Sequence, residues 1–391
     1  MPALTAGVSF TDLAAYATHL VVRAARQLGP APVVVAAIPS LDALVYHVHV
    51  GDLRLVAKVS VLGVPLAVAL RGTYGDIGQL NARMAAYTRT SADRAAEQQQ
   101  HLLLLADAGL NTVSPAGAIG GVLFTHAVDE RTPLSEILRT RPERAEELLG
   151  TVLTSVRAAL RSRDLAKASL DVPGCKITSS LLHGLGASSN WAYFLGQAGR
   201  LSGPRVPGIV AVLDATVRRL VPLVRSLEGP RGLVYGALHP DHILVGDAAQ
   251  STPVLLSPSL QRGPLEADLA RLISRTVLGV VTDPHPQHGS EPVFHAIDQL
   301  VAGLTAVRPP HARDQMLRGL LTLWAADTAS TLAAVLTTPR SVPVPAGALA
   351  IADQATVVCT LLHRVTNAAM AYAGGLEAAW KNLLADLPDL R

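Results

Sequence analysis

The order of apolar and polar positions divides the chain into two parts of different periodicity. Up to about residue 130, short β-branched runs stand between segments with helical spacing, which indicates a small antiparallel sheet with helices. Gly51-Asp52 is expected to form a two-residue hairpin turn. The expected helices are 11–28, 77–87 and 91–108, and the expected strands are 33–38, 43–50, 53–60, 113–118 and 122–127.

Beyond Pro133 the apolar positions recur almost wholly at helical spacing. Strand character returns only in three short runs, at 233–235, 243–245 and 254–256. The expected helices are 144–160, 207–227, 267–281, 293–307, 314–336 and 349–387. The pattern therefore predicts an α+β fold of two lobes, a sheet-containing lobe over 1–128 and a mostly helical lobe over 129–391.

Composition narrows the class of protein. Apolar residues make up 49% of 391 residues, which is enough for a sizeable core. The formal charge is only +3 and no block of Lys or Arg occurs, which argues against a nucleic-acid partner. Cys175 and Cys359 are too few for a disulfide framework or a cysteine metal site. No signal-peptide pattern and no apolar run of membrane-spanning length occur, so we expect a cytoplasmic protein without a membrane partner.

The segment 233–245 carries the most specific motif of the chain. It contains Gly-Ala-Leu-His-Pro-Asp-His-Ile-Leu-Val at 236–245. This resembles the H-G-D-L-H-P-x-N-I-L-V loop of the aminoglycoside phosphotransferase and choline kinase family. The resemblance implies a bilobal protein-kinase-like fold, in which this loop lies at the phosphotransfer site.

Other residues stand where such a fold would need them. Lys58 lies mid-strand, at the place of the lysine that holds the α- and β-phosphates, and Glu97 is in the position of its glutamate partner. The backbone of Thr125 and Ala127 would contact adenine in the linker between the lobes. In the resemblance, Asp268 anchors the catalytic loop and His239 belongs to the hydrogen-bonded scaffold of that loop.

The sequence departs from the family pattern at the positions of the catalytic base and the metal ligands. Tyr235 replaces the first His of the motif, Ala237 the catalytic Asp and His242 the metal-binding Asn. In the metal loop at 254–264, Ser257 replaces the metal-binding Asp, and the expected phosphate-covering turn at 38–42 has no glycine. Mg²⁺ prefers oxygen ligands and the nucleophile needs a base, so we expect no metal site, no required cofactor and no ordinary phosphotransfer. Binding of ATP stays open.

Three functions are compatible with this pattern. The first is a pseudokinase that binds a protein partner, a peptide or a nucleotide in the cleft between the lobes. The second is an active small-molecule phosphotransferase in which a displaced group such as Asp241 serves as base. The third is a subunit of a lanthipeptide- or thioamitide-like modifying system that binds a precursor peptide or promotes thioether cyclisation, with Tyr235, His239 and His242 as acid or base candidates. The sequence leaves the oligomeric state open.

Overall fold

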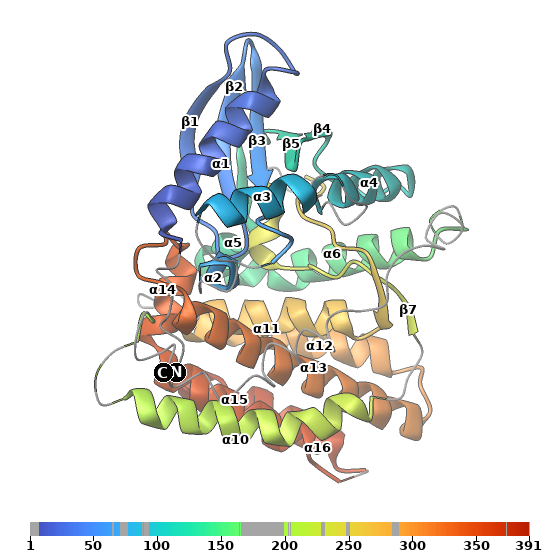
Figure 1. Cartoon of the computed structure of the whole chain (residues 1–391). Helices are drawn as coiled ribbons and strands as arrows, with labels where there is room; N and C mark the ends of the chain where they lie inside the picture. Colours follow the sequence, from blue (N-terminus) through green and yellow to red (C-terminus); the bar gives the residue numbers. More distant parts are fainter. Residues whose placement is uncertain are drawn as a thin grey trace.

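The structure is a computed structural model that describes residues 8–64, 66–70, 77–87, 89, 94–163, 165, 199–201, 203, 205–227, 231–247, 251–283, 289–372 and 374–390. Cys175 lies outside these residues, and Cys359 is a buried free thiol. The chain forms a sheet-containing lobe above a helical lobe (Figure 1). The two-lobed α+β architecture expected from the sequence is confirmed.

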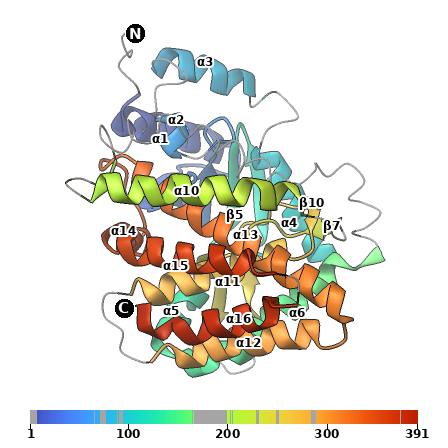
Figure 2. The same ribbon diagram turned by 90° about the horizontal axis from the view of Figure 1, so that it is seen from below.

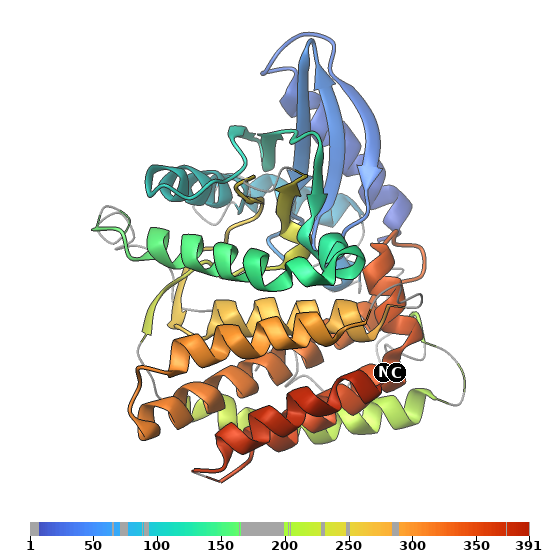
Figure 3. The same ribbon diagram turned by 180° about the vertical axis from the view of Figure 1, so that it is seen from behind.

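The N-terminal lobe is an antiparallel sheet of five strands in the order β1-β2-β3-β5-β4. Seen from behind, the blue strands lie in front of α1 (Figure 3), which places α1 on the other face of the sheet. The elements are α1 (Phe10–Ala25), β1 (Val33–Ile38), β2 (Leu44–Val50), β3 (Leu53–Val59), α2 (Leu66–Ala69), α3 (Ile77–Tyr87), α4 (Arg94–Asp107), β4 (Pro115–Ile119) and β5 (Val122–His126).

Alternation along β3 explains how this lobe positions Lys58. Leu55, Ala57 and Val59 are buried on the face that packs with α1, whereas Val56 and Lys58 lie on the opposite face. The hairpin register pairs Val45 with Lys58. Lys58 therefore sits near the end of β3 on the face away from α1.

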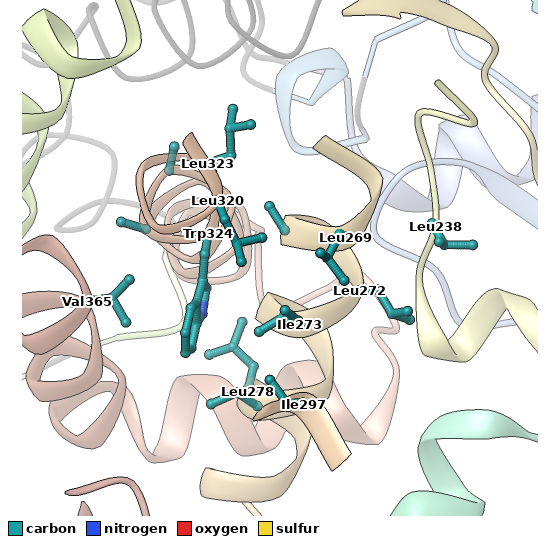
Figure 4. Packing of buried hydrophobic residues seen from close by; sticks show 14 of the residues in the cluster. Leu238, Leu269, Leu272, Ile273, Leu278, Ile297, Leu320, Leu323, Trp324 and Val365 are labelled. Carbon is teal, nitrogen blue, oxygen red and sulfur yellow. The ribbon is translucent and has the colours of Figure 1, made fainter. Parts of the chain in front are cut away.

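The C-terminal lobe is built on the long helix α13 (Pro310–Thr337), which packs against α11 (Ala267–Val281) and α15 (Ala355–Ala369). Trp324 of α13 lies between apolar side chains of these helices (Figure 4). α10 (Val206–Arg225) packs on α13 and α15, as the view from below shows (Figure 2). The remaining helices are α5 (Leu134–Thr140), α6 (Ala145–Leu160), α12 (Glu291–Thr305), α14 (Ala346–Asp353) and α16 (Leu376–Asp386).

Among the described residues, α13 is the one single helix that is long and apolar enough to cross a membrane. The sharply bent pair α14 and α15 also passes that test when it is taken as one broken span. The apolar stretch of α13 is mostly buried by its neighbouring helices, which is the environment of a core helix.

Two features of the helical lobe differ from the sequence expectation. The single helix expected over 349–387 is three helices, with a bend of 80° between α14 and α15. The second break falls at Gly374, whose φ of +86° does not fit a helix. The short elements β6 (Arg131–Pro133) and β10 (Gln261–Pro264) were not expected, because strands of this length carry too little periodicity.

Short strands connect the two lobes. β8 (Ile243–Gly246) pairs with β6 on one side and with β9 (Val254–Leu255) on the other. The N–H of Val113 donates to the carbonyl oxygen of Leu255, and the N–H of Leu255 donates to that of Asn111, both at 3.0 Å. β9 is therefore hydrogen-bonded to strand β8 and to the 111–113 segment of the N-terminal lobe.

Candidate functional site

Asp268 holds the backbone at the start of the 233–245 loop. Its Oδ2 accepts from the N–H of Tyr235 at 2.6 Å, and its Oδ1 accepts from the N–H of Gly236 at 2.7 Å. Burial raises the pKa of Asp268, whereas the two N–H donors and Arg271 act in the opposite direction. The structure thus confirms Asp268 as an anchor of the loop.

Gly236 is required at its position for steric reasons. Its φ is +80°, and a Cβ added there would overlap the carbonyl oxygen of Ser259. Arg271 donates to the Gly236 carbonyl oxygen from the other side. The backbone next to Ala237 is therefore fixed, although the Ala237 side chain is only a methyl group packed against the core.

His239 belongs to the scaffold of the loop, as the sequence suggested. Its Nδ1 accepts from the N–H of Asp241 at 3.1 Å and so caps the 3₁₀ turn Pro240–His242. Burial and then the charge of Arg275 hold the pKa of His239 well below its ordinary value. The exposed Asp241 carboxylate lies 3.5 Å from the same Nδ1.

His242 of the helical lobe lies within electrostatic range of Lys58 of the N-terminal lobe. The His242 ring lies 5.1 Å from that of His239, and its Nδ1 is buried without a hydrogen-bond partner. Burial, followed by the positive charge of Lys58, lowers the pKa of His242 to about 4. Asp42 acts in the opposite direction on the same ring. His242 is therefore neutral near pH 7 and faces a cation.

The prediction of an ion pair between Lys58 and Glu97 is wrong for this structure. Glu97 accepts from Arg94 Nη1 at 2.7 Å, one turn earlier on α4. No ion pair joins Lys58 to Glu97, both of which are described residues. Burial lowers the pKa of Lys58, Asp42 raises it and Arg94 lowers it. Arg94 takes the glutamate because residues three apart on a helix are neighbours.

The metal loop at 254–264 packs over Tyr235. The N–H of Ser259 donates to the Tyr235 carbonyl oxygen at 2.9 Å. The Tyr235 hydroxyl lies near the Ser257 backbone but makes no hydrogen bond of normal geometry, and burial raises its pKa. In the described part of the chain, no group of three or more His, Cys, Asp or Glu side chains is placed to hold a metal ion.

His101 is a contact that the sequence did not suggest. Its Nδ1, on α4, accepts from the buried N–H of Leu260 in the metal loop at 3.2 Å. Burial lowers the pKa of His101, which is consistent with an unprotonated acceptor. α4 is therefore joined to the metal loop through His101.

In the linker between the lobes, backbone N–H groups donate hydrogen bonds within the sheet of the N-terminal lobe. The N–H of His126 donates to the Ser114 carbonyl oxygen, and that of Ala127 donates to the Arg54 carbonyl oxygen, both at 2.9 Å. Thr125 pairs with Val56 in the sheet, and Arg54 forms an ion pair with Asp129. Adenine contacts by Thr125 and Ala127 stay a prediction, and the Ala127 N–H already has a partner.

Arg271 and Arg275 of α11 share one buried carboxylate, and Arg271 also contacts the 233–245 loop. Arg271 Nε and Arg275 Nε donate to Asp327 of α13 at 3.1 Å and 2.7 Å. Burial alone would raise the pKa of Asp327, but the two arginines hold it below its ordinary value. Sequence reasoning missed this network, although a lone acid in an apolar helix was a usable signal.

The fold and site can be set beside known proteins. No family model matches the sequence, and no curated protein matches it. A choline kinase from Cryptosporidium parvum is similar in structure, with a TM-score of 0.51 and 10% identity over 95% of this chain and 99% of that one. An amicoumacin kinase, solved with AMP-PNP, Ca²⁺ and Ami, has a TM-score of 0.50 and 10% identity over 97% and 96%. At such identity the likeness shows the fold, which is the bilobal protein-kinase-like fold.

Proposed function

We propose that this chain is a pseudokinase, a kinase-fold protein without phosphotransfer, and that it binds a peptide or a protein partner between its lobes. The observation that carries the proposal is Ala237 in a loop whose backbone is fully anchored. Asp268 and Gly236 keep the loop in position, while the side chain that would act as base is a methyl group. A base typically contributes about 10²–10⁴-fold to such a reaction.

The groups expected at the metal positions do not fit a divalent ion. His242 is neutral near pH 7 and faces Lys58, and a nearby cation opposes the binding of Mg²⁺. Ser257 carries no charge to offset this. No catalytic step through a metal is derived for this chain.

The alternative base, Asp241, lies in the same loop with an exposed carboxylate. Its N–H donates to His239 Nδ1, and its carboxylate lies 3.5 Å from that same atom. An active phosphotransferase that uses Asp241 is therefore kept as an outcome of the test below.

The first test measures transfer of phosphate from ATP, with Mg²⁺, to water, small hydroxyl compounds and peptides. We expect no transfer above the background rate, because the base and the metal ligands are missing. Mg²⁺-dependent transfer that is lost in Asp241→Asn would contradict the proposal and establish the alternative.

The second test introduces carboxylates at positions 237 and 257 and an amide at position 242. Mn²⁺ binding is measured by electron paramagnetic resonance on wild type, on Ala237→Asp/His242→Asn/Ser257→Asp and on the size-matched neutral variant Ala237→Asn/His242→Asn/Ser257→Asn. We expect at least a tenfold gain in Mn²⁺ affinity for the acidic variant alone, since carboxylates are the missing ligands. Mn²⁺ binding by wild type that is measurable and as tight as that of the acidic variant would contradict the proposal.

A further inference from the structure

Arg271 contacts the loop next to Ala237, and Arg275 lies one turn further along α11. We propose that these two arginines form a binding position for one carboxylate of a peptide ligand, beside the Ala237 methyl group. The inference rests on the proposed function and specifies its ligand as an acidic peptide. It is carried by the fixed orientation of the two guanidinium groups, their surplus charge and their unused N–H groups.

The orientation of both arginines is fixed from the core side. Residues four apart on a helix lie on the same face, so Arg271 and Arg275 reach one carboxylate of α13 together. Their Nε atoms donate to Asp327 at 3.1 Å and 2.7 Å, and Arg275 Nη2 lies 3.4 Å from the same carboxylate. The Asp327 side chain is only 8% exposed. Both guanidinium groups are therefore held in place before any ligand arrives, which lowers the entropic cost of binding.

Arg271 brings this network to the altered position of the loop. Its Nη1 donates to the Gly236 carbonyl oxygen, which belongs to the peptide bond between Gly236 and Ala237. Leu272 of α11 and Leu238 of the loop belong to the same core cluster (Figure 4). A carbonyl oxygen and the Cβ of the next residue are close neighbours along any chain. An anion beside the partly buried Ala237 methyl group would therefore lie near the Arg271 guanidinium.

The network carries more positive than negative charge. Among the described residues, Asp327 is the one carboxylate within ion-pair distance of either arginine. The exposed carboxylate of the loop, Asp241, lies near His239 instead. His239 adds no charge near pH 7, since burial first, and then cations that include Arg275 and Arg271, keep its pKa well below the ordinary value. Two cations and one anion leave one positive charge uncompensated beside the loop.

Each arginine also keeps an N–H group for a ligand. Within the described part of the chain, Arg271 Nη2 and Arg275 Nη1 make no hydrogen bond. The two side chains are 25% and 20% exposed, and neither atom is sealed in the core. Guanidinium N–H groups bind carboxylates through short, charge-assisted hydrogen bonds. One surplus charge suits a single carboxylate better than a phosphate monoester, which carries about −1.5 to −2 at pH 7.

The first experiment tests the position without a ligand, by placing a carboxylate at residue 237. Arginine modification by phenylglyoxal is followed by mass spectrometry at Arg271 and Arg275, with the 80% exposed Arg218 as internal reference. We expect Ala237→Asp to slow modification of both arginines about threefold or more relative to Arg218, because its carboxylate would occupy their N–H groups. The matched neutral variant Ala237→Asn should behave like wild type. Equal rates in the two variants would contradict the proposal, and circular dichroism checks that both fold.

The second experiment uses a peptide as the probe. A capped pentapeptide with one central glutamate is compared with the same peptide carrying glutamine, each at about 10 mM, because a single ion pair gives only weak affinity. We expect the glutamate peptide alone to protect Arg271 in wild type about threefold or more. Arg275→Gln should abolish this protection, whereas Arg225→Gln, at an exposed arginine of α10, should not.

The outcomes separate this inference from the proposed function. Equal protection by both peptides, or protection by neither, would overturn the carboxylate position and leave the absence of phosphotransfer untouched. Inorganic phosphate that protects Arg271 better than the glutamate peptide would also overturn it, because the preferred ligand would then be a phosphate. Transfer of phosphate from ATP would refute the pseudokinase but would not alter the protection measured at the two arginines.

Discussion

Tyr235 and His242 are large side chains of the 233–245 loop, and each buries a polar atom without a hydrogen-bond partner. Such atoms cost free energy, typically about 1–3 kcal/mol each. The loop tolerates them because Asp268, Gly236 and Arg271 fix its backbone independently of those side chains. At the residue scale, the shape of the loop is therefore maintained by residues other than Tyr235 and His242.

The lowered pKa of His242 predicts that the stability of the fold depends on pH. Its pKa in the folded chain is about 4, below the ordinary value of 6.5, so the unfolded chain takes up the proton first as the pH falls. The free energy of unfolding should therefore decrease from about pH 6.5 to about pH 4, and His242 should contribute up to about 1.4 kcal/mol per pH unit to the slope. Urea titrations at several pH values measure this slope.

The matched variants for this measurement are His242→Asn, which should flatten the slope, and His19→Asn, which replaces an exposed histidine of α1. His239 has a lowered pKa too, so part of the slope should remain in His242→Asn. An unchanged slope in that variant would show that His242 is not the group that titrates.

The sequence could predict residue positions but not their partners. Asp268 and His239 were recognisable, because a family motif fixes their spacing to the loop. The partner of Glu97 was not, because whether this glutamate reaches Lys58 or pairs with Arg94 depends on how α4 is rotated, which no periodicity reports at that resolution.

At the scale of elements, the polar side chains of α4 make contacts of two kinds. Arg94 and Glu97 pair along the helix, whereas His101 reaches the metal loop at Leu260. The second contact joins a helix of one lobe to a loop of the other. It adds to the apolar packing of Ala95 and Leu102 that holds α4 in place without an ion pair to Lys58.

Replacing His101 should loosen this connection. His101→Phe keeps a ring of similar shape but leaves the buried N–H of Leu260 without an acceptor, at an expected cost of about 1–3 kcal/mol. Chemical denaturation measures the loss, and hydrogen exchange at Leu260 should become faster. Gln100→Ala, on the exposed side of the same helix, is the control and should change neither quantity. Unaltered exchange at Leu260 would exclude the contact.

Elements with several repeated apolar positions were predicted well, whereas very short strands and the break in the expected helix 349–387 were missed, for a physical reason. The 33–38 strand and the 267–281 helix matched their observed bounds, because several apolar positions repeat within each. β6 and β10 are defined by pairing with residues more than 25 positions away, which leaves almost no local pattern. The break between α14 and α15 has no glycine or proline to signal it.

At the scale of the whole molecule, the strand β9 contacts both lobes. Val254 of β9 packs with Ala95, Leu102, Val113 and Leu123 of the N-terminal lobe. The same strand pairs with β8 in the middle of the chain. Residue 128 stays the predicted boundary between the lobes, but the hydrogen bonds and apolar contacts of β9 cross it.

We therefore expect the lobes to unfold together. Fluorescence of Trp324 and Trp380, which lie in the helical lobe, reports one lobe, and hydrogen exchange of β2 and β3 reports the other. Their midpoints in urea should coincide, because loss of β9 removes partners from both lobes. Midpoints that differ clearly, with the sheet melting first, would mean that the shared strand adds little to cooperativity.

The position of β9 in the chain also has a consequence during synthesis on the ribosome. Asn111 is bonded to Pro253, which is 142 residues further along. At roughly 5–20 residues per second, about 7–28 seconds pass before that partner is made. Throughout this interval the nascent N-terminal lobe exposes an unpaired backbone edge and an unfinished apolar cluster, both of which invite aggregation. The cell must protect the emerging chain until residue 255 arrives, and slow translation would lengthen the exposure.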